Sequence, residues 1–419
     1  MTEQSNHAIV YGASGLVGWS MVDQLLKQYP EPGTFSKITA ITNRPLDISR
    51  SCWPEPNAKG PKLELVSGVD LRHVDGPTFA ESLKDKLEDI ASVTHVYYLV
   101  FTAIADDIEE VDTNLRMMQN VIHAHERFSP NLRFVAFPGG TRIRGYGIYA
   151  PGGTFTPPLQ EHMVSNLPPD YAATVVYPAY RKLLDKASKG TSWTWCEVCP
   201  DAIIGFTPNG SQFSLALHWA QYLSLYAYNH GKGANTPPAE DTIVKVPFPG
   251  NAAGANSLFT PASSQTIARF MVYASLNPGT CGQGNLFNIA DHQKPCTYGE
   301  LWPKVAEWFG LEGVGPADES ESNLNTLKVG ELPDSTASLP PGEYISKHKE
   351  IFLRHDCENA VTAGVGAGHR QLDSVGYWLT FDRQMSVEKI RKTGFEGDKD
   401  PVIGWIESFE MFRKAGLIL

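Results

Sequence analysis

The chain has 419 residues, 42% of them hydrophobic and 19% charged, which is typical of a globular protein. Its 35 Lys and Arg residues against 46 Asp and Glu residues give a formal net charge of −11, without any basic run. A nucleic acid or an anionic membrane surface would require clustered cations, so the composition argues against both as partners. Any anionic ligand must therefore be bound locally.

The length predicts two domains, because one domain usually has about 100–200 residues. The first residues lack the basic and apolar regions of a secretory signal, and polar residues interrupt the long uncharged stretch 202–231, so we expect no membrane insertion. Six cysteines in so long a chain form no disulfide framework. We expect a soluble, cytoplasmic protein.

Short apolar runs alternate with amphipathic segments up to residue 205, the pattern of a parallel sheet covered by helices. The predicted strands are 7–11, 37–42, 63–68, 95–101, 132–137 and 194–199. Later helices are predicted at 214–228, 266–275, 298–309 and 401–412, whereas 231–249 and 252–264 resemble loops. We predict an α/β protein: a doubly wound Rossmann sheet in 1–205 and a smaller, mixed, mainly substrate-binding domain in 206–419, with some segments of the second half returning to the Rossmann core.

A glycine-rich turn follows the first predicted strand directly and opens a helix. In Gly12-Ala-Ser-Gly15-Leu-Val-Gly18, the first glycine permits the tight turn, the second lets a pyrophosphate approach the backbone, and the third lets helix and strand pack closely. The pattern predicts a dinucleotide site at the helix N-terminus. Its candidate cofactor-binding residues are Gly12, Ser14, Gly15, Leu16, Val17 and Gly18.

The end of the second strand indicates which dinucleotide is bound. An acidic residue there would hydrogen-bond the ribose 2′-hydroxyl of NAD, but this strand ends in Asn43-Arg44, with no acid before Asp47. A guanidinium can instead bind a 2′-phosphate with two hydrogen bonds, so the sequence favours NADP(H). Further along the cofactor we place Asp70 and Leu71 beside the adenine and Val100, Phe101 and Thr102 after the fourth strand.

Several segments along the chain carry a family resemblance: GASGLVG, THVYYLVFTA, DTNLRMMQNV, NLRFVAFPGG, WCEVCPDAIIGFTP, NLFNIADH and the closing FDRQMSVEKIRKTGF. The chain resembles the progesterone 5β-reductase/iridoid synthase-like enzymes, which are atypical extended short-chain dehydrogenases/reductases, and is most similar to their fungal members. The resemblance implies NADPH-dependent 1,4-reduction of a hydrophobic enone or enal, and we expect a role in secondary metabolism. In such a reaction the developing enolate oxygen needs a preorganised donor.

The resemblance implies a catalytic tyrosine at the head of a helix and a lysine after the fifth strand. Thr174-Val-Val-Tyr177 stands where the family has Asn-Phe-Tyr-Tyr, so Tyr177 is the expected catalytic tyrosine, with Tyr180 and Tyr146 as alternatives. Arg142 occupies the lysine position and keeps the positive charge, but a guanidinium does not relay a proton as an ammonium might. Enone reduction tolerates this change better than carbonyl reduction.

Other family positions suggest contacts to the nicotinamide and the substrate. Val198-Cys-Pro-Asp201 replaces the family's His-Arg-Pro-Gly, while Pro200 and Ile203 keep the loop that packs on the nicotinamide face. Substrate-lining candidates are Tyr146, Tyr180, Phe206, His218 and Trp219, although a core role for His218 fits as well.

Two further functions remain open: a non-redox isomerase or cyclase on the same scaffold, and an NmrA-like dinucleotide sensor without catalysis. Tyr177 is followed at four-residue spacing by Arg181 rather than by the lysine of the ordinary Tyr-x-x-x-Lys signature. Cys196 and Cys199, three apart on a strand, point to opposite faces, so we expect no metal site. The expected partner is a small hydrophobic carbonyl substrate, and a homodimer would be compatible with the sequence.

Overall fold

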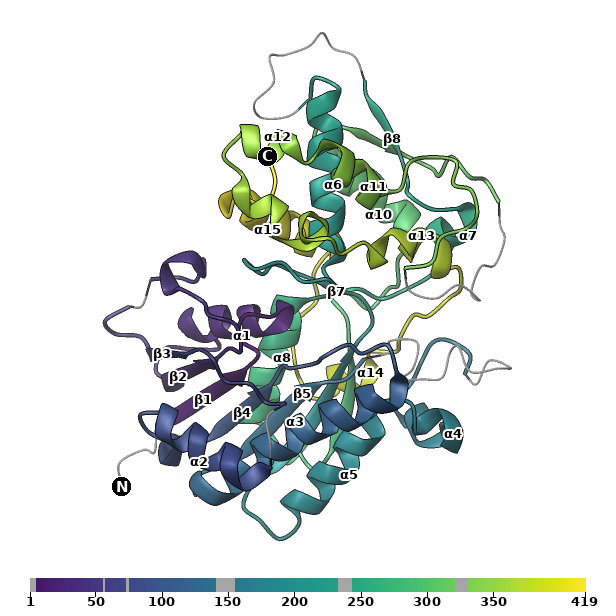
Figure 1. Ribbon diagram of the computed structural model, residues 1–419. Coiled ribbons are helices and arrows are strands. Elements are labelled where there is room, and N and C mark those ends of the chain that lie inside the picture. The colour runs from purple at the N-terminus through teal and green to yellow at the C-terminus, as the bar shows by residue number, and fades with distance from the viewer. Residues whose placement is uncertain (1–4, 56, 73–74, 141–154, 233–242, 321–329) are drawn as a thin grey trace. The chain divides into compact units, whose positions relative to one another are not determined.

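The computed structural model describes residues 5–55, 57–72, 75–140, 155–232, 243–320 and 330–419 (Figure 1). The chain divides into two compact units, each described separately below. Unit 1 comprises 1–201, 265–289 and 386–397, and unit 2 comprises 202–264, 290–385 and 398–419. The segments 265–289 and 386–397 are therefore the parts of the second half that return to the first unit.

Unit 1 is built on one seven-stranded parallel sheet in the order β10-β6-β5-β4-β1-β2-β3. The strands are β1 (Asn6–Tyr11), β2 (Phe35–Ile41), β3 (Lys62–Val66), β4 (His95–Tyr98), β5 (Phe134–Pro138), β6 (Thr194–Pro200) and β10 (Asn285–Ile289). The strand order reverses between β1 and β4, where a doubly wound sheet binds its ligand outside the carboxyl ends of the strands. The Rossmann prediction is confirmed.

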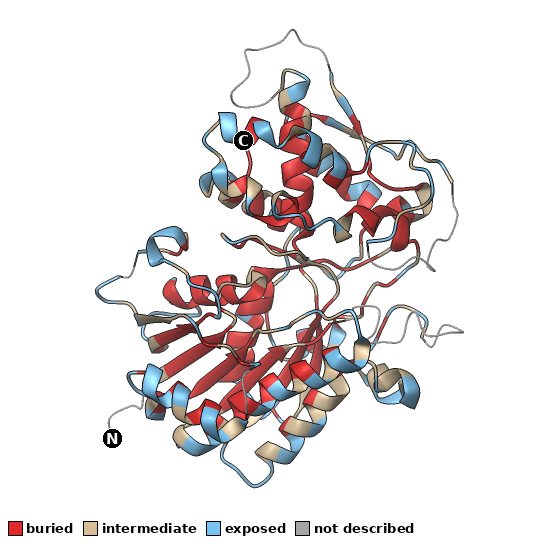
Figure 2. Cartoon of the chain, in the orientation of Figure 1, coloured by how far each residue is buried: buried red, intermediate tan, exposed pale blue. Residues whose placement is uncertain are grey.

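Helices cover both faces of this sheet. On one face lie α2 (Gly76–Lys86), α3 (Asp107–Phe128) and α5 (Val176–Ser188), which pack on one another (Figure 1). The helices α1 (Leu16–Leu26) and α8 (Ser264–Leu276) are joined by a 2.7 Å hydrogen bond from Arg269 Nε to Gln24 Oε1. The short elements α4 (Pro169–Ala172), α9 (Pro278–Cys281) and α14 (Glu388–Arg391) complete the unit. Buried residues fill the strands, as Figure 2 shows.

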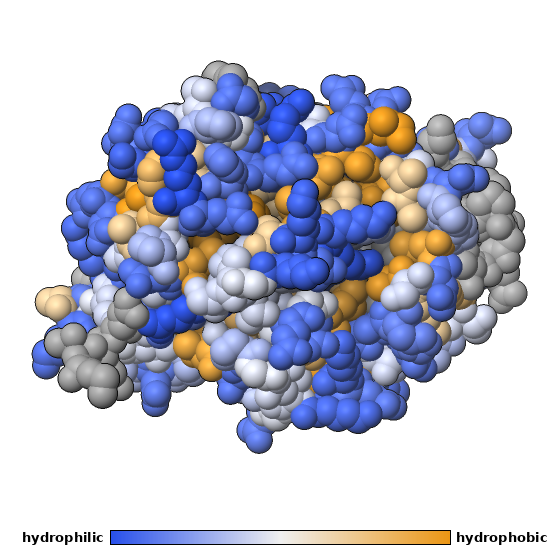
Figure 3. Space-filling model, turned by 90° about the horizontal axis from the view of Figure 1, so that it is seen from below, coloured by the Kyte–Doolittle hydropathy of each residue, from blue (hydrophilic) through white to orange (hydrophobic). Residues whose placement is uncertain are grey.

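Unit 2 is organised around the apolar helix α6 (Leu215–Asn229), which is buried along most of its length. Around it lie α7 (Ala252–Asn256), α10 (Tyr298–Glu307), α11 (Pro341–His348), α12 (Glu350–Arg354), α13 (Val375–Trp378) and α15 (Pro401–Lys414). Unit 2 also contains two short pairs of parallel strands. They are β7 (Ile203–Ile204) with β9 (Ala262–Ser263), and β8 (Lys245–Pro247) with β11 (Glu312–Val314). Figure 3 shows one face of the molecule, seen from below the view of Figure 1, on which hydrophilic side chains predominate and apolar side chains form separate patches.

The structure corrects three details of the predicted elements. The passage 252–264, expected as loop, contains α7 and β9, because the Asn251 side chain caps α7 by accepting from the Gly254 N–H at 2.8 Å. The passage 231–249, also expected as loop, contains β8. Strand β10 was not among the predicted strands. Its five residues lie at the sheet edge beside β6, in register from Asn285 opposite Cys196.

Candidate functional site

The turn between β1 and α1 has the geometry of a phosphate-binding loop. Gly12 lies at φ +78°, and its N–H donates to the Ile41 carbonyl at 3.1 Å, so the chain turns sharply at the end of β1. A Cβ on Gly18 would overlap the carbonyl oxygen of Gly12 and lie 2.7 Å from its carbonyl carbon. A Cβ on Gly15 would meet only that oxygen, at 3.2 Å. Gly12 and Gly18 are therefore required by the fold itself, whereas Gly15 is required much less.

The first turn of α1 suits an anion. Its N-cap, Gly15, provides no side-chain hydrogen bond, and the first turn, which contains Leu16 and Val17, has no acidic residue. The N–H groups at a helix start lack intrahelical partners and carry partial positive charge. The space beside Gly15 at the start of α1, into which a Cβ would project, thus fits the pyrophosphate of a dinucleotide. Ser14, half-buried, lies in the same turn.

The carboxyl end of β2 presents a cation rather than an acid. Asn43 and Arg44 are both exposed, and Arg44 pairs with no acidic residue in the described part of the chain. Asp47 is engaged in its own turn, where Oδ1 accepts from the N–H and the hydroxyl of Ser49, each at 2.9 Å. Those hydrogen bonds lower the pKa of Asp47, mainly through the backbone N–H. The arrangement leaves Arg44 available to an anion.

The ends of β3 and β4 contribute backbone and side-chain groups to the same edge. Asp70 forms a two-point ion pair with Arg72, with Nε–Oδ1 and Nη2–Oδ2 distances of 3.0 and 2.9 Å. The Leu71 carbonyl accepts from Asn120 Nδ2 at 3.0 Å, which fixes this segment to α3.

Asn114 of α3 fixes the loop after β4. Its Oδ1 accepts from the Thr102 N–H at 2.9 Å, and its Nδ2 donates to the Thr102 carbonyl at 2.8 Å. Asn114 is fully buried, whereas Phe101 remains exposed and Val100 half-buried. The sequence shows Asn114 in the quoted motifs but does not reveal this clamp, because it joins groups on two different elements.

The two tyrosines of α5 have different surroundings. Tyr177 stands in the first turn, half-buried, and packs against the apolar cluster between the sheet and helices α2, α3 and α5. Tyr180 is only 2% exposed, lies edge-on to Tyr98 and Phe137, and donates to the Asn114 carbonyl at 3.3 Å. Burial raises the pKa of Tyr180 well above its usual value. Tyr180 is thus a core side chain of unit 1, while Tyr177, in the first turn of α5, is only half-buried.

The other predicted residues fall into three groups. Arg142 and Tyr146 lie outside the described residues. Pro200 ends β6 and is buried in unit 1, whereas Ile203, in β7, belongs to unit 2. Phe206, also in unit 2, packs on Phe412 of α15 with ring centroids 5.4 Å apart.

His218 and Trp219 are core residues of unit 2. Trp219 is 1% exposed and stacks on Trp405 at 5.1 Å, with other aromatic rings around it: Phe248, Tyr298 and Trp302. His218 is 2% exposed, and its Nε2 lies 2.9 Å from Asp373 Oδ1. Asp373 Oδ1 also accepts from the Gly342 N–H at 2.6 Å. These contacts give both residues a packing role within the unit.

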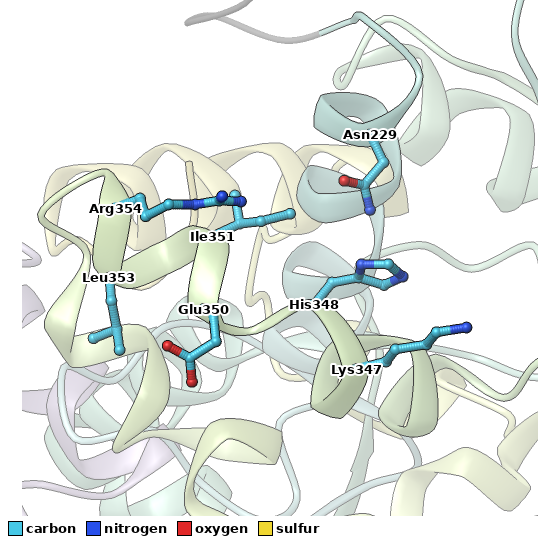
Figure 4. Close-up of a pocket in the computed structure, with 7 residues that line it drawn as sticks. All are labelled: Asn229, Lys347, His348, Glu350, Ile351, Leu353 and Arg354. Atoms are coloured by element: carbon cyan, nitrogen blue, oxygen red, sulfur yellow. The ribbon is translucent and has the colours of Figure 1, made fainter.

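A pocket of about 440 Å³ lies on unit 2, among α6, α11 and α12 (Figure 4). Its lining is Asn229, Lys347, His348, Glu350, Ile351, Leu353 and Arg354. None of the residues predicted from the sequence lines this pocket. It mixes both signs of charge with apolar groups, and we assign it no part in catalysis.

One arrangement in unit 1 escaped the sequence analysis. Arg181 of α5 binds the buried Glu197 of β6 through two hydrogen bonds, with Nε–Oε2 and Nη2–Oε1 distances of 2.5 and 3.0 Å. The sequence signal was available: an acidic residue inside an apolar strand needs a buried partner. In the sequence, Arg181 stands out only by its spacing from Tyr177.

Neither a metal centre nor a membrane span is found in the described ranges. Among these residues, no three His, Cys, Asp or Glu side chains are placed to hold a metal ion. Cys196 and Cys199 are buried, and burial raises the pKa of both thiols. No helix in the described ranges combines the length and the apolar character needed to cross a bilayer.

The sheet order and the glycine turn define the class of fold, a doubly wound Rossmann sheet with a dinucleotide-binding turn. Solved structures with this fold include a GDP-D-glycero-L-gluco-heptose synthase of Campylobacter jejuni, determined with NADPH, at a TM-score of 0.57 and 12% identity over 99% of this chain and 100% of that chain. A GDP-mannoheptose C4 reductase of the same organism, with NADP bound, gives a TM-score of 0.54 at 12% identity over 97% and 100%.

The chain belongs to the PRISE-like Rossmann-fold family, whose model matches residues 8–419. A short chain dehydrogenase of Leptosphaeria maculans is 33% identical over 98% of this chain and 97% of its own length. Another, of Aspergillus calidoustus, is 30% identical over 100% and 96%. A 3-oxo-Δ(4,5)-steroid 5β-reductase of Arabidopsis thaliana is 26% identical over 97% and 92%. The predicted family and the prediction of a short-chain dehydrogenase/reductase enzyme are confirmed.

Proposed function

We propose that the protein is an NADPH-dependent reductase of the carbon–carbon double bond in a hydrophobic α,β-unsaturated carbonyl compound. The observation that carries the proposal is Tyr177, at the head of α5 in the unit that holds the glycine turn, with a carboxylate-bound arginine at the position of the usual lysine. A tyrosine without an adjacent ammonium is suited to donating a hydrogen bond rather than to relaying a proton.

The choice of NADPH rests on the end of β2. Arg44 is exposed and unpaired among the described residues, and Asp47 is turned to its own hydrogen bonds. A cation is thus available to bind a 2′-phosphate, and no carboxylate is available to bind a ribose 2′-hydroxyl. When bound, NADPH would supply the hydride that adds to the β-carbon of the substrate.

Tyr177 then acts on the other end of the conjugated system. As the β-carbon accepts the hydride, the electrons of the double bond shift and the carbonyl oxygen becomes an enolate. The Tyr177 hydroxyl donates a hydrogen bond to that oxygen, and Arg142 contributes positive charge. The α-carbon later takes a proton from water. The 5β-reductase relative, whose name specifies a 3-oxo-Δ(4,5)-steroid, supports this substrate class.

The test is a turnover assay with the purified protein and NADPH. Absorbance at 340 nm is followed with progesterone, 2-cyclohexen-1-one and a linear 2-enal, and the products are identified by mass. We expect saturated carbonyl products, and Tyr177→Phe should lower kcat about 100-fold, the usual loss for one oxyanion donor. Tyr228→Phe, at a half-buried tyrosine of unit 2, is the matched control and should change little.

Other outcomes would favour the other functions. A product formed without NADPH consumption would indicate an isomerase or cyclase. NADPH binding without turnover of any carbonyl compound, and with Tyr177→Phe silent in vivo, would indicate a dinucleotide sensor. A role in secondary metabolism, a cytoplasmic location and a homodimer stay predictions.

A further inference from the structure

The Arg181–Glu197 pair is a built feature of unit 1. Glu197 has 1% of its side chain exposed and Arg181 20%, and the guanidinium meets both carboxylate oxygens. Removing one partner of such a pair leaves an uncompensated buried charge, whereas apolar residues often replace both partners without loss of stability. Stability by itself therefore does not explain why the pair is present.

The position of Glu197 ties the pair to the strand ends. It lies in β6 between Phe137 of β5 and Leu286 of β10. Its carboxylate fills the space beside Gly139, where an added Cβ would lie 2.9 Å from Glu197 Cδ. Gly139 begins the segment that leads from β5 to Arg142, and its N–H donates to the Val198 carbonyl at 2.8 Å. Glu197 therefore faces the edge at which a doubly wound sheet binds its ligands.

Arg181 connects this carboxylate to Tyr177. The two residues are four apart on α5, so their side chains emerge on one face, one turn from each other. In the ordinary Tyr-x-x-x-Lys arrangement a positive charge at this spacing favours the tyrosinate. Here Glu197 supplies an equal negative charge to the same guanidinium.

We propose that Glu197 and Arg181 are positioning residues for Tyr177: they hold the first turn of α5 at the strand ends and cancel the charge that Arg181 would otherwise present to the tyrosine. The inference rests on the proposed function, for which it specifies the role of Tyr177. With the charge cancelled, Tyr177 keeps its proton throughout and stabilises the enolate as a hydrogen-bond donor. It does not exchange a proton with a neighbouring cation.

Several groups besides the pair surround the face of α5 that carries Tyr177. Tyr180 lies on the same helix, Tyr98 faces it from β4 and Glu110 lies on α3. Burial raises the pKa of Tyr98 and Tyr180, so both stay neutral. Arg181 shares the helix face of Tyr177 at one-turn spacing, and Glu197 reaches the same guanidinium from β6.

Three variants distinguish an effect of the charges on Tyr177 from a purely structural role of the pair. Glu197→Gln keeps the shape of the side chain and leaves Arg181 positive, whereas Arg181→Gln leaves Glu197 negative. Arg181→Met combined with Glu197→Leu removes both charges. Tyrosinate absorbance at 295 nm is titrated for each protein and for the same protein carrying Tyr177→Phe, and the difference reports Tyr177 alone.

We expect Tyr177 to titrate about one pH unit lower in Glu197→Gln, about one unit higher in Arg181→Gln, and as in the unmodified protein when both charges are removed. Either single variant suffices if the other does not fold. A single variant whose midpoint does not move, or moves in the opposite direction, would overturn the proposal, and so would a shift in the double variant as large as in a single one.

The titration needs no turnover, so its failure is distinguishable from a failure of the proposed function. Where turnover is found, the alkaline limb of kcat/KM should move by the same amounts and in the same directions. A purely structural pair would lower the amount of folded protein and leave that limb where it is.

Discussion

The glycine turn allows fold and cofactor binding to be tested separately, because Gly15 and Gly18 meet different surroundings. Gly18→Ala would place a Cβ 2.7 Å from the Gly12 carbonyl carbon, closer than side chains approach backbone. Gly15→Ala would place one 3.2 Å from the Gly12 oxygen, a contact that a small shift relieves, and Gly15 already lies at φ −85°. The first change should disturb the protein itself and the second mainly the bound phosphate.

The expected magnitudes differ accordingly. Overpacking costs about 1–3 kcal/mol, and alanine regains up to about 1 kcal/mol of helix propensity inside α1, so Gly18→Ala should destabilise the protein by about 1–2 kcal/mol. For Gly15→Ala, the weaker N-cap and the reduced entropy of the unfolded chain offset each other, which leaves a net change below about 0.5 kcal/mol. A methyl group at the pyrophosphate should nevertheless weaken NADPH binding at least about 10-fold.

Urea denaturation without cofactor gives the stability of each variant, and quenching of tryptophan fluorescence by NADPH gives its affinity. Gly15→Ala should be as stable as the unmodified protein and should bind NADPH more weakly. If Gly15→Ala bound NADPH normally, the phosphate would not lie against this residue. If Gly18→Ala were as stable as the unmodified chain, the close approach of α1 to β1 would be wrong.

Three other results are expected. Burial lowers the pKa of His7 to about 4 and of His95 and His125 to about 3. Below pH 6.5 the unfolded chain therefore binds more protons than the folded protein, and the free energy of unfolding should decrease as the pH is lowered, by up to about 1.4 kcal/mol per pH unit for each histidine. Urea midpoints measured at pH 7.5, 6.5 and 5.5 would show this decrease. Unchanged midpoints would contradict the buried neutral state. Arg44→Ala should raise the Kd for NADPH about 10-fold or more and leave the Kd for NADH nearly unchanged. If the affinity for both cofactors fell equally, Arg44 would not contact the 2′-phosphate. Trp219→Ala should cost about 3–5 kcal/mol of stability, whereas a stable variant with only a raised KM would show that the ring lines the substrate site.

Much of unit 1 could be predicted because its strands are short, apolar and buried on both faces. Strands β1 and β6 were predicted to within one residue at each end. The glycine turn was also predictable, because the residues that such a turn requires lie next to one another in the sequence, between Gly12 and Gly18. Strand β10 could not be recognised by the same criterion, because Asn285-Leu-Phe-Asn-Ile289 alternates little and its two asparagines are typical of turns.

In unit 2, the sequence pattern alone does not decide the roles of His218 and Trp219. His218 and Trp219 were candidates for the substrate site because the family binds substrate near this helix. In the structure both are enclosed by side chains from distant segments, such as Trp405 and Asp373. Nothing in the local pattern of α6 distinguishes a tryptophan that faces a pocket from one that stacks on a residue almost 200 positions later.

The Arg181–Glu197 pair shows which clue was missed and why it matters for function. A glutamate in the middle of Trp195-Cys-Glu197-Val-Cys199 breaks an otherwise apolar run, and burial of an unpaired carboxylate would cost several kcal/mol. The cation that pairs with it comes from α5: it is Arg181, one turn after Tyr177. In the role that we propose for the pair, the charge of Arg181 neutralises Glu197, and Tyr177 acts as a hydrogen-bond donor without taking part in a proton relay.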